Sequence, residues 1–154
     1  MNLDPTPDQR SIMEAFGDVF ARESTSERVR ANLGTGFDAG LWRLIVELGA
    51  VGIAVDEDAG GVGAGLLELV LVAEQAGRRL ACVPLVEAAV AARVLAGAAA
   101  RGDQVAAELL GRALDGGVCV FAPRPARAGV AELVPGGSAA EAVVALDGDE
   151  LVVA

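Results

Sequence analysis

The sequence predicts a mainly helical protein: a bundle of about five or six helices over residues 5–115, followed by a partial antiparallel β region. Apolar residues recur at intervals of three and four through most of the first 115 residues, and residues typical of helix ends bracket these stretches. After residue 117 the pattern changes to short apolar runs separated by Pro, Gly and Asp, which is typical of strands. We therefore expect two domains, a helical one at 1–115 and an incomplete β domain at 116–154.

The first helix is predicted to begin after Thr6, because Thr-Pro-Asp-Gln resembles a capping box. Pro7 lies in the first turn, where its missing N–H costs nothing. The helix should run to about residue 22, since one apolar stripe continues to that point through Ile12, Met13, Phe16, Val19 and Phe20. A short second helix is predicted over 24–33.

The third predicted helix begins after Asp38, a favourable N-cap, and ends at Gly49. It is apolar around most of its circumference, so we expect it to be central. Val51–Val55 is too short for a helix and lies between glycines, which predicts an extended segment. Helical periodicity then returns over Leu66–Leu80.

Two more helices complete the predicted bundle. The first begins at Pro84 and continues as an alanine-rich segment to about Ala100. Gly102 interrupts it, Asp103 can cap the second, and Asp115–Gly117 ends that helix.

The end of the chain is predicted to form strands at Val118–Phe121 and Val130–Val134 and a hairpin. In the hairpin, Ala142–Leu146 and Glu150–Val153 flank an Asp-Gly turn, which tolerates the positive φ of a tight turn. An isolated hairpin is only marginally stable. We therefore expect the edge of the last strand to associate with another chain.

Composition excludes several classes of function. The net charge of −10 argues against a nucleic-acid partner. The absence of histidine excludes a Ser-His-Asp triad and imidazole metal sites. Cys82 and Cys119 form no Cys-x-x-Cys motif, so we interpret them as core thiols in a reducing compartment. No secretory signal or long uncharged apolar run is present, and we expect a soluble, cytoplasmic protein without a membrane partner.

Three local clusters have both a structural and a functional interpretation. The glycine-rich segment 60–65 follows an extended segment, but its spacing matches no phosphate-binding motif and acidic residues precede it. We interpret Asp56, Glu57 and Asp58 as a solvated loop rather than a metal or acid–base cluster. Arg78 and Arg79 fit a helix end better than a coenzyme-phosphate site.

The segment LWRLIVELGAVGIAVDEDAGGVGAGLLELVLVAEQAGRRLACVPL at 41–85 resembles the amino-terminal domain of acyl-CoA dehydrogenases. The resemblance rests on a helix ending in Glu-Leu-Gly, an acidic segment closing on Gly-Gly, and a helix ending in Gly-Arg-Arg-Leu. It extends over about residues 5–115, with Asp56 in place of the proline in the family's Pro-Glu-x-x-Gly-Gly segment. Residues 117–154 resemble pieces of the family's middle β domain.

The resemblance implies flavin-dependent α,β-dehydrogenation of acyl-CoA thioesters, with FAD as the cofactor. Complete members have a Thr-Glu-Pro-x-x-Gly-Ser-Asp-like flavin segment, whereas only Ala122–Arg127 stands there in this chain. The carboxy-terminal domain with the catalytic glutamate is also missing. We therefore assign no catalytic, cofactor-binding or metal-binding residue, and we do not expect this chain alone to oxidise acyl-CoA.

The resemblance also implies a substrate-binding face. Pro84, Leu85, Ala88 and Ala92 lie on one face at helical spacing. In acyl-CoA dehydrogenases the equivalent helix lines the acyl cavity, and two alanines would leave room for a broad acyl group. Ordinary helix packing explains the same small residues.

The chain is consequently interpreted as a truncated form or a non-catalytic subunit of an acyl-CoA dehydrogenase. Its expected partners are an acyl-CoA substrate and either a second copy or a related acyl-CoA dehydrogenase subunit. Two alternatives remain: a helical scaffold without ligand, and a standalone acyl-CoA-binding module.

Overall fold

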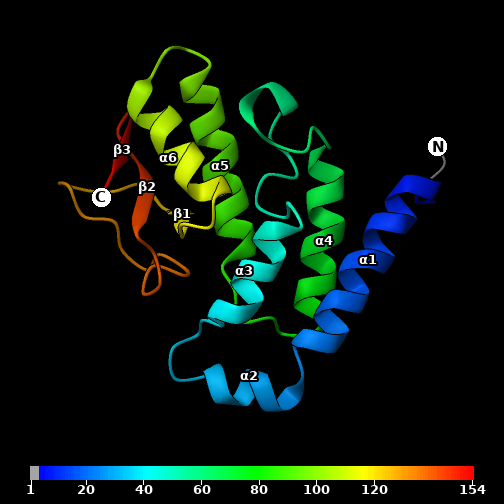
Figure 1. Ribbon diagram of the computed structural model, residues 1–154. Helices are drawn as coiled ribbons and strands as arrows, with labels where there is room; N and C mark the ends of the chain where they lie inside the picture. The colour runs from blue at the N-terminus through cyan, green and yellow to red at the C-terminus, as the bar shows by residue number, and fades with distance from the viewer. Residues whose placement is uncertain (1–3) are drawn as a thin grey trace.

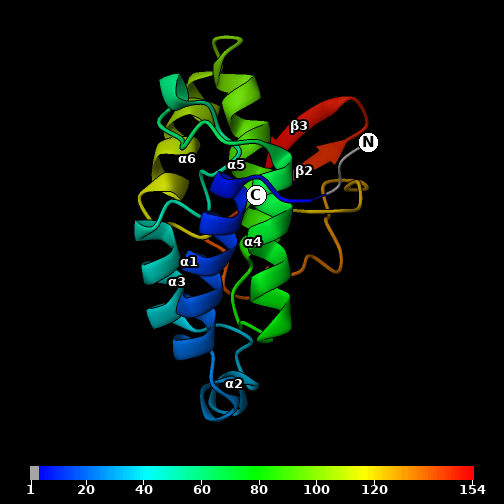
Figure 2. The ribbon, with the colours of Figure 1, turned by 90° about the vertical axis from the view of Figure 1, so that its right-hand side faces the viewer.

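The computed structural model describes residues 4–154, so the first residues of the predicted helical domain lie outside the described part. Six α-helices are followed by a three-stranded sheet. Figure 1 shows the sheet beside α5 and α6, with α4 and then α1 toward the other side of the molecule and α2 across one end; Figure 2 shows the same arrangement from the side of α1. The helices are α1 Pro7–Glu23, α2 Ser26–Asn32, α3 Ala39–Glu47, α4 Leu66–Arg78, α5 Leu85–Ala99 and α6 Gln104–Leu114, and the strands are β1 Cys119–Phe121, β2 Ala142–Asp147 and β3 Glu150–Val153.

The three predicted side-chain caps, Thr6, Asp38 and Asp103, are confirmed because each accepts hydrogen bonds from the first turn of its helix. Gln9 N donates to Thr6 Oγ1 at 3.2 Å, and Thr6 N donates back to Gln9 Oε1 at 2.9 Å, which closes the capping box of α1. Asp38 caps α3, and Asp103 accepts from the third residue of α6. The second helix begins later than predicted, at Ser26, because Ser24 ends α1 and its hydroxyl donates to Arg79 O at 3.0 Å.

The central helix is α5 rather than α3. It packs against α6 and β1 and buries seven residues, including Ala88, Ala92 and Leu95 at 0% exposure. Alanine side chains let neighbouring elements approach this helix on several sides. The prediction that α3 would be central is wrong: α3 buries only one face, and Leu48 at its end is 48% exposed.

The predicted extended segment Val51–Val55 forms consecutive turns instead of a strand. Its apolar residues are nevertheless buried; Val51 and Val55 are each 1% exposed. Val62 N donates to Gly52 O at 2.9 Å, and Gly63 N donates to Val55 O at 2.8 Å. The segment therefore satisfies its backbone by folding against the glycine-rich loop that follows it, not by pairing with another strand.

The sheet is mixed, so the predicted partial β region is antiparallel only in its β2–β3 pair. Strand β1 pairs parallel to β2, with Cys119 opposite Ala142, whereas β2 pairs antiparallel to β3, with Val144 opposite Val153. The hairpin is therefore confirmed. A parallel pair requires a long crossover connection, and the connection between β1 and β2 supplies it.

The predicted strand Val130–Val134 lies in that connection and does not form. Within the described residues this stretch contributes only an isolated bridge between Arg127 and Val130. Leu133 has φ 54°, which is incompatible with a strand, and Pro135, directly after the stretch, has no N–H to donate to a neighbouring strand.

Candidate functional site

The four residues predicted to line an acyl cavity lie together at the start of α5, as their spacing predicted. Leu85 is 2% exposed, Ala88 and Ala92 are fully buried, and Pro84 is buried immediately before the helix. We call them the α5 face. Its three helix residues, Leu85, Ala88 and Ala92, all belong to the main core. The structure thus places the four residues together, and an acyl-binding role stays a prediction.

A loop of the β region covers the beginning of the α5 face. A Cβ atom built on Gly136 would lie 2.5 Å from Cβ of Pro84, so the loop backbone passes directly over this proline. Gly136 has φ +72°, a conformation that also favours glycine. Val134 and Ala139 of the same loop pack against the core. Access to the α5 face from this side therefore requires the loop to move.

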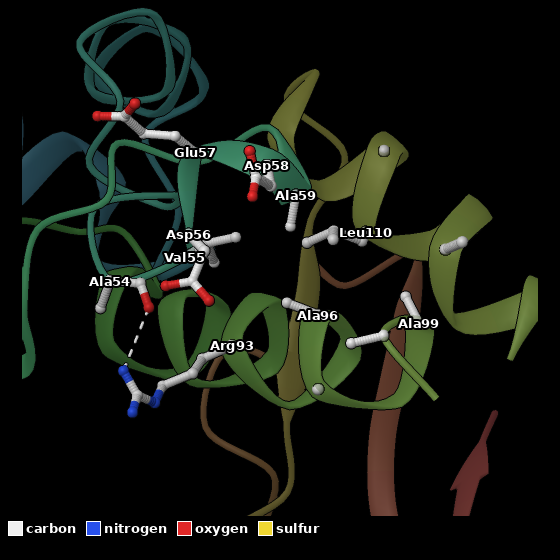
Figure 3. Close-up of a pocket in the computed structure, with 14 residues that line it drawn as sticks. Ala54, Val55, Asp56, Glu57, Asp58, Ala59, Arg93, Ala96, Ala99 and Leu110 are labelled. Atoms are coloured by element: carbon white, nitrogen blue, oxygen red, sulfur yellow. Dashed lines mark hydrogen bonds between the residues drawn. The ribbon is translucent and has the colours of Figure 1, made fainter. Parts of the chain in front are cut away.

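A second hollow lies on another side of α5 and has a volume of about 950 Å³ (Figure 3). We call it the acidic groove. Its walls come from the segment 54–59, which contains the short 3-10 helix η1 (Glu57–Ala59), from the second half of α5 and from α6. It is lined by Ala54, Val55, Asp56, Glu57, Asp58, Ala59, Arg93, Ala96, Gly97, Ala99, Ala100, Ala107, Leu110 and Gly111.

The charges of the acidic groove are nearly all negative. Asp56, Glu57 and Asp58 are exposed, and no side-chain hydrogen bond or ion pair engages them within residues 4–154. The one cation among the lining residues, Arg93, donates through Nη1 to the backbone oxygen of Ala54 at 3.2 Å. In Figure 3 the Asp56 carboxylate points toward α5, whereas Glu57 points away from it. Across the part of the chain that the structure describes, no group of three or more His, Cys, Asp or Glu could hold a metal ion.

The glycine-rich loop beside the groove offers no phosphate cradle. Two of its amides donate to the segment that precedes it: Gly61 N donates to Asp56 O at 3.0 Å, and Gly63 N donates to Val55 O at 2.8 Å. The amide of Gly65 donates to Glu68 Oε2 at 2.9 Å, at the start of α4. These N–H groups are therefore not free for an anion, which agrees with the interpretation of this segment as a connecting loop.

The two arginines at the end of α4 show helix-end interactions. Arg78 pairs with Glu74 one turn earlier, with 2.6 Å between Nη2 and Oε1. Arg79 is the C-cap of the helix. Both positions suit the negative end of the helix dipole.

The residues that follow β1 do not fit a flavin. Ala122 N donates to Val144 O at 2.8 Å, and Ala126 N donates to Leu146 O at 2.6 Å. Both alanines are buried and pack with Ala145. The backbone donors and small side chains of this segment are therefore used to pack it against the sheet. We derive no redox step from it.

The acidic groove is the feature that sequence reasoning missed. Its signal is present in the sequence as two pairs of small residues, Ala96 with Ala100 and Ala107 with Gly111, each four positions apart. Residues four apart lie on the same helix face. Both pairs line the same hollow only because α5 packs beside α6.

Comparison with known proteins places this architecture in a family. The sequence model described as "Acyl-CoA dehydrogenase, N-terminal domain" matches residues 6–116. Acyl-CoA dehydrogenase IpdE2 of Mycobacterium tuberculosis is 30% identical over 110 residues, which are 70% of this chain and 35% of that protein. IpdE2 of Mycolicibacterium smegmatis is 29% identical over 143 residues, 91% of this chain and 42% of that protein. The chain therefore matches less than half the length of these relatives.

Two solved structures superimpose on nearly the whole chain. A variant of the Tcur3481–Tcur3483 steroid ACAD matches with a TM-score of 0.76 and 26% identity, over 95% of this chain and 46% of that one. The ChsE4–ChsE5 complex from Mycobacterium tuberculosis matches with a TM-score of 0.76 and 25% identity, over 99% of this chain and 48% of that one. Both matches include the partial β region as well as the helices.

Proposed function

This chain belongs to the acyl-CoA dehydrogenase family, and from that premise we propose that it acts as a non-catalytic subunit of a heteromeric, flavin-dependent acyl-CoA dehydrogenase. One observation carries the proposal: 99% of the chain superimposes on part of a chain from the two-protein ChsE4–ChsE5 complex. A related subunit would then supply FAD and the catalytic base. We place the complex in the cytoplasm, and no helix within the described residues is long and apolar enough to cross a membrane.

The proposed substrate is a bulky acyl-CoA thioester, of the steroid type named for one of the two structural matches. In this proposal the α5 face forms one wall of the acyl cavity. Ala88 and Ala92 would leave room for a broad ring system, because an alanine side chain is a single methyl group. A larger side chain at either position would occupy that room. The loop at Gly136 would move aside when the partner or the acyl group occupies this face.

In the complete enzyme FAD would supply the acceptor for the hydride that leaves the β-carbon, and a base on the partner would take the α-proton. No residue of this chain takes either step in the proposal. Its contributions are shape and exclusion of water: a wall of buried apolar side chains keeps solvent away from the acyl group. The chain alone should therefore show neither flavin absorbance nor turnover.

The test is co-expression with a related acyl-CoA dehydrogenase subunit, followed by flavin absorbance and turnover with an artificial electron acceptor. Ala92→Leu should lower kcat/KM for a steroid acyl-CoA much more than for a short-chain acyl-CoA. Ala98→Leu is the matched control, because Ala98 is also buried on α5, at 5% exposure, but lies off the α5 face. For each variant, the ratio of kcat/KM for the steroid acyl-CoA to kcat/KM for the short-chain acyl-CoA is compared. A loss of folded protein lowers both values equally, whereas a narrowed acyl cavity changes the ratio.

Other outcomes would contradict the proposal. Turnover by the pure chain with added FAD would show that it is catalytic by itself. Tight acyl-CoA binding by the chain alone, without association with any related subunit, would indicate a binding module. If Ala92→Leu kept the same preference between the steroid and the short-chain acyl-CoA, the α5 face would not line the acyl cavity. Subunit association would then be judged from the co-expression result.

A further inference from the structure

The floor of the acidic groove is built for close approach. It is lined by Ala96 on α5, by Ala100 at the C-cap of α5, and by Ala107 and Gly111 on α6. Small residues at the contact allow two helix axes to come to the short end of the usual range, about 8 Å apart. A groove with two such pairs, one on each helix, is shaped to receive a third helix lying along it.

The rim of the groove carries negative charges that form no ion pair within residues 4–154. Asp56 and Asp58 line the groove, and neither carboxylate has an ion pair within residues 4–154. Arg93 is already directed to the Ala54 carbonyl. With a chain net charge of −10 around it, this rim favours a cationic occupant and disfavours an anionic one.

The acidic wall is fixed before anything binds. Gly61 N donates to Asp56 O at 3.0 Å, and Gly60 N donates to Glu57 O at 2.9 Å. A Cβ atom on Gly61 would lie 2.1 Å from Val55 O, so this turn is packed tightly against its own backbone. The backbone of this wall therefore has little ordering entropy left to lose on binding, which favours a preformed groove.

We propose that the acidic groove docks a helix of a partner protein. That helix carries small or apolar residues on the side facing α5 and α6, and arginine or lysine residues on the edge facing Asp56 and Asp58. The small pairs determine how close the helix lies, and the carboxylates determine its charge. The site is separate from the α5 face, and the proposal does not depend on acyl-CoA chemistry.

The test uses two synthetic, fluorescently labelled, alanine-rich helices of about 18 residues, long enough to hold helical structure in water. One carries arginines along one edge, and the other carries glutamates at the same positions. The arginine peptide should bind and the glutamate peptide should not, as measured by fluorescence anisotropy. No binding of the arginine peptide up to about 1 mM, where the binding free energy is only about −4 kcal/mol, would overturn the proposal.

Charge variants distinguish the groove from the general acidity of the surface. Asp56→Asn with Asp58→Asn should weaken the arginine peptide about tenfold, which corresponds to about 1.4 kcal/mol. Asp8→Asn with Asp18→Asn removes the same charge from α1, on the far side of α4 (Figure 1), and should leave binding unchanged. Equal weakening by the two pairs would mean that attraction is diffuse and the groove is not a site.

Steric variants test the floor. Nothing lies within 4 Å of a Cβ atom built on Gly111, so there is room for a side chain at this position, and Gly111→Leu would place a bulky group on the floor of the groove. It should abolish binding of the arginine peptide. Gly77→Leu on α4 is the matched control, because a Cβ there also meets nothing within 4 Å and Gly77 does not line the groove. Undiminished binding to Gly111→Leu would refute the docking geometry.

Discussion

Asp38 joins two helices, and its replacement offers a quantitative test of the fold. The side chain is buried at 7% exposure. One carboxylate oxygen caps α3 by accepting from Gly40 N at 3.1 Å and Leu41 N at 3.0 Å. The Arg28 guanidinium from α2 binds the same carboxylate through two hydrogen bonds, of 3.0 and 2.8 Å. Asp38→Ala would remove the cap and this two-point contact together.

The magnitude follows from adding the two contributions. Loss of an N-cap costs about 1 kcal/mol. Hydrogen bonds to a charged group contribute about 1.5–3 kcal/mol, to be reduced here because the Arg28 side chain is 37% exposed. We therefore expect Asp38→Ala to lower the free energy of unfolding by about 2–4 kcal/mol. Asp103→Ala should cost only about 1 kcal/mol, since Asp103 caps α6 by one bond, at 3.0 Å to Ala106 N, and pairs with no guanidinium within residues 4–154.

Urea denaturation measures the difference, with the fluorescence of the single tryptophan, Trp42, as the signal. This residue reports on the core because it is 3% exposed and its Nε1 donates to Gly116 O at 2.8 Å. The m-value should stay constant, so that the midpoint shift gives the free energy. Equal losses for Asp38→Ala and Asp103→Ala would refute the reasoning, because the Arg28 contact would then contribute nothing.

The same contact predicts a pH dependence. Burial by itself raises the pKa of Asp38, but hydrogen bonds from Arg28 and from the backbone amides of Leu41 and Gly40 outweigh it, so the folded pKa lies below the ordinary value. The stability from ionised Asp38 is therefore fully present above the unfolded pKa, about 3.9, and is lost as pH falls through the lower folded value. The stability difference between wild type and Asp38→Asn should be constant near neutrality and shrink below about pH 4. A difference that grew on acidification would contradict this sign.

Two further substitutions and one labelling experiment follow from packing. Gly61→Ala should destabilise the protein by about 1–3 kcal/mol or more in urea, because the new Cβ would lie 2.1 Å from Val55 O; wild-type stability would show that the turn is loose. Gly77→Ala, where the Cβ meets nothing within 4 Å, should instead stabilise α4 by about 0.5–1 kcal/mol. Iodoacetamide should modify the half-buried Cys82 well before Cys119, which is 2% exposed and whose pKa is raised by burial. Mass spectrometry of the folded protein measures the order, and early labelling of Cys119 would contradict its burial.

Helix ends could be predicted from the sequence because they depend on local interactions. Thr6, Asp38 and Asp103 accept hydrogen bonds from amides two or three residues away, so the residues that determine each cap are adjacent in the chain. The Asp-Gly hairpin between β2 and β3 was predictable for the same reason. The family resemblance over about residues 5–115 also rests on local motifs, the Glu-Leu-Gly, Gly-Gly and Gly-Arg-Arg-Leu segments within 41–85, and is confirmed by the match over 6–116.

Elements that depend on distant partners were predicted less well. Val130–Val134 has the composition of a strand, but β2 already pairs with β1 on one side and β3 on the other, so no neighbouring edge of β2 remains for it. Val51–Val55 looked extended because it is apolar and lies between glycines, yet it is buried as turns against the following loop. Strand pairing and burial are non-local, and a short apolar run fits several structures until its neighbours are in place.

The candidate sites divide in the same way. Helical spacing alone placed Pro84, Leu85, Ala88 and Ala92 on one face, because the period of an α-helix is fixed. Only the tertiary structure decided that this face is fully buried and that the loop at Gly136 covers it. It alone also created the acidic groove, since a hollow belongs to no single helix: it exists where α5, α6 and a turn from much earlier in the chain leave space between them.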